Sequence, residues 1–508
     1  MQNVFLHAKI SLFSRLSCFL LLITPFSALP PLGADLASAP VNQSLNRLAS
    51  FAELIASSSA TILATGHDLE ASRNSAMQQK MGFRPLLRVD EGASKSSNRN
   101  YNTLTGIDED YTTKRKGSTV SLQQRTPIGT ARLDFERSRT EYTTAQASFF
   151  SSAYMTLETG LLRRDSRMLT LEKQISRSGW LTEKERFDSV LLDTLMSGCN
   201  MLLDRLLAEQ NLLFRERNLI FYQKMLEEAN VKLENGLGSE LDRKQAEMRL
   251  TMAETDLEQS RLSLEEADRQ IGVLLASSTW NHDLASFTPG ELAAAVPPEF
   301  SPEALTDVAL KKRPDIRMIR VQLETQKKSV SLAREKAKPN VSSSLRWGRQ
   351  GRATDQEMAR DMRDKSWDVL IGYETTLGPR PEKLEKRAEQ ERLNALEDRF
   401  GLSCDAARKA VIDKADRLKF QLKNLADLKQ SKALSAEILE GQRLNFQLGK
   451  VSLLDLLKYQ SDFEASCLAE IQGETALVRY WLQLQYEIGQ LTEYLRVSSS
   501  SAGKKFTH

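Results

Sequence analysis

The chain has 508 residues, and its 70 basic and 67 acidic side chains leave a formal net charge of +3. This balance excludes a nucleic-acid-binding protein that depends on bulk positive charge. Its four cysteines and four histidines are scattered along the chain, so neither a disulfide framework nor a metal cluster is expected. The sequence has no nucleophile–base pair and no phosphate loop, so we expect no enzyme activity and no cofactor.

The first 39 residues have the pattern of an export signal. Lys9 and Arg15 form a basic start, and an apolar run follows them over residues 16–28. Small residues then end at Ala39. This pattern predicts a signal peptide over residues 1–39, with the cleavage point left open. The alternative is a membrane anchor, for which the apolar run is short.

The next part of the chain, residues 40–276, predicts a helix, a group of strands and a helical hairpin. The first helix is expected over 44–80. A long helix is expected over 164–234, which has no proline, and a shorter one over 239–276 has a heptad stripe typical of coiled coils. Between the first two helices, strands are expected over 83–90, 119–124, 131–136 and 153–161.

A stretch rich in proline and glycine, residues 277–302, predicts a linker beside the middle of the long helices. The following part, residues 303–495, repeats the earlier order of elements. Its predicted helices are 303–338, a long 381–447 and a shorter 453–493, and its predicted strands are 341–348 and 367–377. The Ser/Gly/Lys-rich residues 496–508 predict a disordered tail.

Two short motifs indicate that the chain contains a duplicated unit. The segment NGLGSELDRKQAEMRL (235–250) returns as LGKVSLLDLLKYQSDF (448–463). Gly236 matches Gly449, and 449 − 236 gives an offset of 213 residues. Each glycine supplies the backbone freedom that a tight reversal between two helices needs. In each copy a Ser-x-x-Asp motif follows, which a capping box at the start of the returning helix explains without any further function.

The two strands of the second unit have one apolar face. Apolar residues occupy every second position over about ten residues, and aromatic residues lie at one end, as in strands that face lipid. A soluble hairpin packed on helices shows the same alternation, so both interpretations stay open. The residues on the apolar face are Val341, Leu345, Trp347, Trp367, Val369, Ile371 and Tyr373.

Together these motifs resemble the TolC-like outer-membrane efflux proteins, or outer-membrane factors. The resemblance is carried by KRPDIRMIRVQLETQKKSVSLAREKAKPNVSSSLRWG (312–348), NGLGSELD (235–242) and QLGKVSLLDLL (447–457), in the family's order. It implies a mostly α-helical homotrimer with a membrane β-barrel part and a long antiparallel coiled-coil α-barrel. Each protomer would give four strands to a twelve-stranded barrel. By analogy with the second unit, we expect the first and last strands of residues 82–163 to take part. Whether the middle pair is an extra hairpin outside the barrel is left open by the sequence.

The resemblance also implies a function and its partners. The protein would be a passive channel in the outer membrane that extends into the periplasm, as the exit duct of a tripartite efflux or type I secretion system. A periplasmic adaptor and an inner-membrane pump would be its partners. The alternative is a periplasmic coiled-coil adaptor or scaffold, although an adaptor normally has one helical hairpin and this chain has two.

The same resemblance assigns roles to residues at the two glycine turns, which would form the far tips of the tunnel. Asp242 and Asp455 would set the charge of the tunnel entrance. Lys458 occupies a position where many relatives have a further acid, which argues against a strong preference for cations. The residues expected to dock the adaptor are Gly236, Leu237, Ser239, Gly449, Val451 and Ser452.

Overall fold

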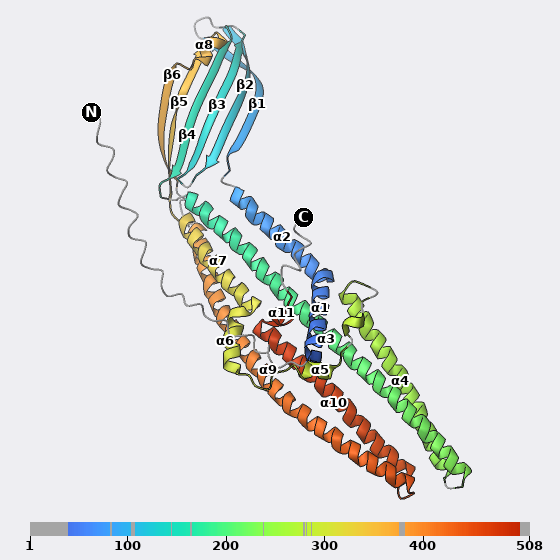
Figure 1. Ribbon diagram of the computed structural model, residues 1–508. Helices are drawn as coiled ribbons and strands as arrows, with labels where there is room; N and C mark the ends of the chain where they lie inside the picture. The colour runs from blue at the N-terminus through green and yellow to red at the C-terminus, as the bar shows by residue number, and fades with distance from the viewer. Residues whose placement is uncertain are drawn as a thin grey trace, which may run out of the picture.

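A sheet of six strands stands at one end of a long helical body (Figure 1). The computed structural model describes residues 39–81, 84–102, 107–126, 128–143, 145–162, 165–236, 238–277, 280, 282–285, 287–374 and 381–497. The predicted signal peptide over residues 1–39 therefore lies, but for its last residue, outside the described residues, as does nearly all of the predicted tail.

The six strands form one antiparallel sheet in the order β1-β2-β3-β4-β5-β6. The four strands per copy that the resemblance implies are therefore too few, because this sheet has six. The middle pair, β2 and β3, lies inside it because each of these strands is hydrogen-bonded to a neighbour along both edges. The strands are β1 (Leu86–Asn102), β2 (Ile107–Arg125), β3 (Thr130–Tyr142), β4 (Ser148–Gly160), β5 (Asn340–Ala353) and β6 (Asp364–Glu374).

Two very long helices form the frame of the body. They are α3 (Asp165–Glu234), with 70 residues, and α9 (Pro381–Gln447), with 67. At a rise of about 1.5 Å per residue, each is roughly 100 Å long. Each turns back into a shorter helix, α4 (Glu240–Leu274) after α3 and α10 (Leu453–Ile488) after α9. These two hairpins confirm the four long helices predicted from the sequence, except that α10 ends at Ile488, before the predicted 493, because Gly489 adopts a left-handed φ of 76°.

The two remaining helical stretches are each broken, which corrects the expectation of single helices. Arg313 separates α6 (Pro302–Lys312) from α7 (Pro314–Lys336). The break occurs because Pro314 has no N–H to continue the hydrogen-bond ladder of α6 and disfavours the helical conformation at Arg313. Ser59 separates α1 (Ala39–Ser58) from α2 (Ala60–Met81). Among the described helices none is long and apolar enough by itself to cross a membrane, while α1 and α2 reach the required length and hydropathy only together, across a bend of 56°.

The hydrophobic core lies in the middle of the body, where both halves of the chain meet. Leu195, Leu202 and Leu203 of α3 are fully buried there together with residues of α1, α9 and α10. The connecting segment 277–302 packs on this core with η1 (His282–Ala285) and α5 (Pro289–Ala293), and the Trp280 ring lies 5.8 Å from that of Phe51. The chain closes over the same core with α11 (Leu491–Tyr494). The long helices thus share one central core, and their ends extend beyond it.

Candidate functional site

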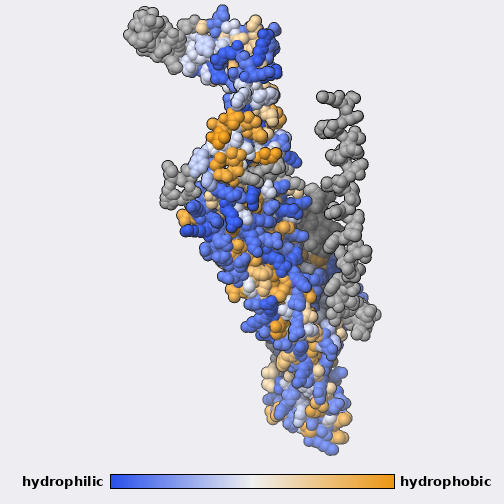
Figure 2. Space-filling view, turned by 90° about the vertical axis from the view of Figure 1, so that its left-hand side faces the viewer, coloured by the Kyte–Doolittle hydropathy of each residue, from blue (hydrophilic) through white to orange (hydrophobic). Residues whose placement is uncertain are grey.

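One face of the sheet has a band of exposed apolar side chains across all six strands. In one row of cross-strand partners, Leu87, Leu122 and Leu133 are followed by Met155, Trp347 and Trp367. Figure 2 shows hydrophobic surface over the lower half of the sheet on the β6 side, with hydrophilic surface above it. We call this band the apolar belt; its members are Leu87, Val89, Val120, Leu122, Leu133, Phe135, Met155, Leu345, Trp347, Trp367, Val369, Ile371 and Tyr373, with exposed fractions from 37 to 71%.

The apolar belt shifts along the strands from one edge of the sheet to the other. On β1 it consists of Leu87 and Val89. On β6 it starts at Trp367, which lies in the same cross-strand row as Leu87, and continues to Tyr373 in the direction opposite to Val89, toward the helical body. A level band across strands that are tilted by about 35–45° has this staggered form. The belt therefore has the geometry of a layer of constant height on a tilted sheet.

The other face of the sheet is mostly polar, and some of its charges form ion pairs. Arg88 lies 2.7 Å from Asp90, and Arg132 lies 2.7 Å from Asp134. The Tyr154 hydroxyl donates a hydrogen bond of 2.7 Å to Gln350. A sheet with an exposed apolar belt on one face and a mostly polar opposite face can separate lipid from water.

The two tips lie at the far end of the body from the sheet (Figure 1). Gly236 and Gly449 have φ values of 66° and 69°, in the left-handed region that glycine adopts without strain. In the second turn the Gly449 amide donates to Phe446 O at 3.0 Å and the Lys450 amide donates to Asn445 O at 2.9 Å. This is the Schellman pattern, which satisfies the last carbonyls of α9. Leu237 lies outside the described residues.

The serine and aspartate after each turn cap the returning helix. Ser239 Oγ accepts from the Asp242 amide at 3.1 Å, and Asp242 Oδ2 accepts from the Ser239 amide at 3.2 Å. Ser452 Oγ accepts from the Asp455 amide and donates to Asp455 Oδ2 at 2.6 Å. Capping therefore accounts for these four side chains as structural residues. Around them, Lys458 is exposed and Val451 is partly exposed, so both are accessible at the tips.

A buried polar cluster above the tips joins the two hairpins, and the sequence analysis missed it. The Tyr222 hydroxyl of α3 donates a hydrogen bond of 2.8 Å to Glu464 Oε1 of α10. Gln460 donates to the same oxygen at 3.1 Å, and Arg215 lies 2.9 Å from Asp256 and 3.9 Å from Glu464. Burial and the neighbouring Glu464 carboxylate raise the pKa of Tyr222, so its hydroxyl stays a donor. A polar side chain at a buried heptad position is the signal that could have identified this cluster.

The described residues offer no evident metal or redox site. Among them no group of three or more His, Cys, Asp or Glu side chains is arranged to hold a metal ion. Cys199, Cys404 and Cys467 are free thiols, and burial raises the pKa of Cys199 to about 12. The candidate site is therefore the apolar belt together with the tips.

No sequence-family model matches the chain, and no curated protein sequence shows significant similarity to it. Solved structures do match. The outer-membrane channel OprN aligns with a TM-score of 0.65 at 16% identity over 89% of this chain and 90% of its own. The Campylobacter jejuni CmeC outer membrane channel aligns with a TM-score of 0.63 at 12% identity over 88% of this chain and 86% of its own. The outer membrane protein VceC from Vibrio cholerae aligns with a TM-score of 0.62 at 15% identity over 89% of this chain and 96% of its own. The chain thus has the fold of these outer-membrane proteins, as the resemblance in the sequence predicts.

Proposed function

We propose that this protein is a passive channel of the outer membrane whose helical body forms a tunnel in the periplasm. The observation that carries the proposal is the apolar belt, because six strands expose it on one face while the opposite face is mostly polar and includes ion pairs. Burying the belt in lipid removes its apolar side chains from water, which is favourable by about 25 cal/mol per Å². Two of the fold neighbours, OprN and CmeC, are themselves outer-membrane channels.

A single copy cannot complete such a channel, and we infer that three copies close it. The outer edges of β1 and β6 have no partner strand among the described residues, and an open edge is unfavourable in lipid. The strand directions alternate, so β6 of one copy is antiparallel to β1 of the next, as a closed antiparallel barrel requires. Three sheets of six strands give a barrel of eighteen strands, which is wider than the twelve-stranded barrel that the resemblance implies.

The tips are the proposed docking surface for a periplasmic adaptor that links the channel to an inner-membrane pump. Gly236, Ser239 and Ser452 are exposed there, and Gly449 and Val451 belong to the same turns; with Leu237 they complete the proposed docking set. Asp242, Asp455 and Lys458 place two acids and one base near the proposed entrance. Such a complex would serve efflux or type I secretion, with energy supplied by the pump.

A periplasmic adaptor or scaffold is the alternative function, and the two proposals differ in where the sheet lies. A scaffold would be released with the periplasm and would keep its sheet in water. The channel should fractionate with the outer membrane and migrate on gels as a heat-sensitive, detergent-resistant oligomer.

A pair of neighbouring substitutions tests the role of the belt directly. Val369 and Leu370 are adjacent on β6, are 54% and 68% exposed, and point to opposite faces. Val369→Arg places a charge on the proposed lipid face, where it costs about 2–4 kcal/mol, so the detergent-resistant oligomer should be lost or weakened. Leu370→Arg faces the proposed water-filled interior and should leave the oligomer intact. Equal effects of both substitutions would contradict a lipid-facing belt.

A further inference from the structure

The outward face of the sheet changes from apolar to basic directly beyond the apolar belt. Arg349 and Lys365 are neighbours in the row above Trp347 and Trp367, and Arg137 is two residues beyond Phe135. At about 3.3 Å per residue, this places the first cations roughly 7 Å above the belt. We call these exposed side chains the basic collar; its members are Lys95, Lys114, Lys116, Arg137, Arg139, Arg349 and Lys365.

Most charges of the basic collar have no acidic partner among the described residues, whereas several arginines of the opposite face do. Within the described part of the chain, only Arg139 of the collar forms an ion pair, with Glu141 at 2.9 Å. On the opposite face Arg88, Arg115 and Arg132 each lie within 2.7 Å of a carboxylate. A surface on which cations outnumber the acidic side chains is suited to an external anion.

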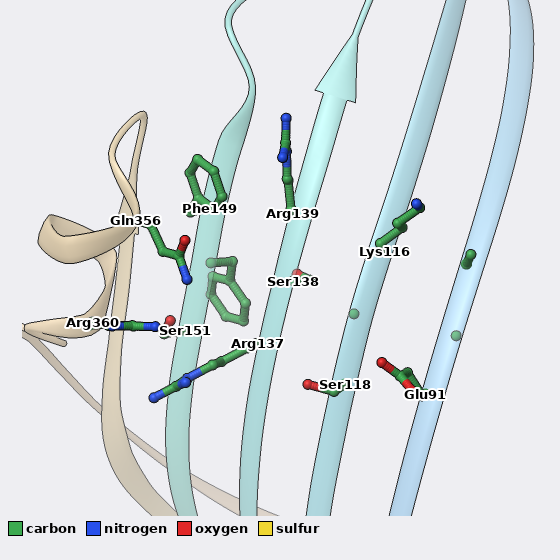
Figure 3. Close-up of a pocket in the computed structure, with 14 residues that line it drawn as sticks. Glu91, Lys116, Ser118, Arg137, Ser138, Arg139, Phe149, Ser151, Gln356 and Arg360 are labelled. Atoms are coloured by element: carbon green, nitrogen blue, oxygen red, sulfur yellow. The ribbon is translucent and has the colours of Figure 1, made fainter.

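A groove of about 590 Å³ lies within the collar, between α8 (Gln356–Arg360) and the outward face of β1 to β4. Figure 3 shows Gln356, Arg360 and Arg137 gathered around Ser151, with Lys116 and Arg139 farther along β2 and β3. Ser151 is 96% buried, since only 4% of it is exposed.

The groove has a defined shape because α8 packs closely on β5. A Cβ at Gly351 would lie 2.5 Å from the carbonyl oxygen of Ala359, so only glycine allows this approach. Asp355 caps α8 by accepting from the Glu357 and Met358 amides at 3.1 and 3.3 Å. The position of Arg360 opposite Arg137 therefore follows from local packing and does not depend on a ligand.

The chemistry of the groove matches a phosphorylated sugar. Guanidinium groups such as those of Arg137 and Arg360 bind phosphate oxygens in a bidentate manner. Hydroxyl and amide groups of Ser118, Ser151 and Gln356 can bond to sugar hydroxyls, and the Phe149 ring adds an apolar surface beside them. Glu91 is the one carboxylate that lines this groove.

We propose that the groove and the basic collar bind the phosphate groups of a glycolipid in the outer leaflet of the membrane. This inference rests on the proposed function, which places the apolar belt in lipid and the helical body in the periplasm. The collar lies on the far side of the belt from the body (Figure 1), so it meets the headgroups of the outer leaflet. Acyl chains would lie along the belt while the phosphates contact Arg137 and Arg360.

The test uses the full-length protein in detergent and measures its affinity for lipid A, a diglucosamine lipid with two phosphates. Arg137→Gln combined with Arg360→Gln should weaken binding at least about tenfold, because two charge-assisted contacts are lost. The matched control, Arg88→Gln with Arg132→Gln, removes the same charge from the opposite face and should change affinity less than about twofold. If the first pair of substitutions prevents assembly, Lys116→Gln with Lys365→Gln provides the same comparison.

Two further measurements identify the source of the phosphate and separate this inference from the proposed function. Dephosphorylated lipid A should bind more weakly than lipid A, and inorganic phosphate should compete only at far higher concentration. Equal binding of the dephosphorylated lipid, or binding of inorganic phosphate as tight as that of lipid A, would overturn the inference. Fractionation of the unmodified protein tests the channel separately, so a protein that lies in the outer membrane but does not distinguish the two lipids refutes the glycolipid site alone.

Discussion

At the scale of single residues, the contact between Tyr222 and Glu464 links the two hairpins near the tips. Both side chains are more than 90% buried, so a lost hydrogen bond cannot be replaced by water without cost. Tyr222→Phe should lower the free energy of unfolding by about 1.5–3 kcal/mol, the range for a hydrogen bond to a charged group. Chemical denaturation followed by circular dichroism measures this loss.

Tyr480→Phe is the control for this substitution. The Tyr480 ring also lies in the helical body, against the core. Its hydroxyl forms no hydrogen bond with another described residue. The control should therefore unfold as the unmodified protein does. A Tyr222→Phe variant that is as stable as the control would mean that the cluster does not hold the hairpins together.

Asp188 on α3 gives a prediction for the dependence of stability on pH. Burial raises the pKa of Asp188, and the neighbouring Arg317 opposes this shift only in part. Because the folded-state pKa is higher than the unfolded one, this group contributes stability at low pH and loses it as the pH rises through the folded-state pKa. Asp188→Asn should therefore stabilise the protein at pH 7 and have no such effect near pH 3. Thermal unfolding at both pH values measures the difference, and an equal effect at both would contradict it.

The residues of the second hairpin of strands could be predicted from the sequence, whereas those of the polar cluster and the groove could not. Trp347 and Trp367 follow a period of two along the chain, and the structure places them as cross-strand partners. Tyr222 and Glu464 are 242 positions apart, and each resembles an ordinary polar residue of a helix. Arg137 and Arg360 line the same groove only because α8 folds onto β4 and β5, which no local pattern predicts.

At the scale of elements, the glycine turns determine how each hairpin reverses. Gly449 has a φ of 69°, while proline is fixed near −65° and has no amide to bond to Phe446. Gly449→Pro should therefore distort the tip and abolish export, while the sheet still inserts into the membrane. Gly449→Asn keeps the amide and tolerates the left-handed conformation, so it should retain export. Export by the proline variant at the normal level would remove the tip from the proposed mechanism.

The long helices were predictable as elements, but the full extent of the strands was not. Neither α3 nor α9 has a proline after its first turn, and both were predicted to within a residue. In contrast, β1 continues to Asn102 through a polar stretch without alternation. This stretch of β1 belongs to the sheet because it pairs with β2. It lies beyond the apolar belt, where polar residues are expected. A search for alternating apolar residues therefore finds only the lower halves of the strands.

At the scale of the whole molecule, the sheet and the body have different means of stabilisation. The body has a central core shared by both halves of the chain. The sheet has an exposed apolar belt and two edges that have no partner strand among the described residues. The sheet of one copy in water would thus leave apolar area and backbone groups unsatisfied. The proposed assembly in lipid would resolve both problems together, because the belt would meet acyl chains and each edge would meet the next copy.

Disulfide cross-linking across the proposed junction tests this assembly. In a background with its four cysteines replaced by serine, Val89→Cys on β1 is combined in turn with Trp367→Cys, Val369→Cys or Ile371→Cys on β6. All four positions are on the outward face, and the series of three covers the stagger between neighbouring copies. A disulfide needs Cα atoms about 4.4–6.8 Å apart, so at least one combination should give covalent trimers on non-reducing gels. The outcome that contradicts the assembly is a cross-link formed only within single chains, because the sheet would then close on itself.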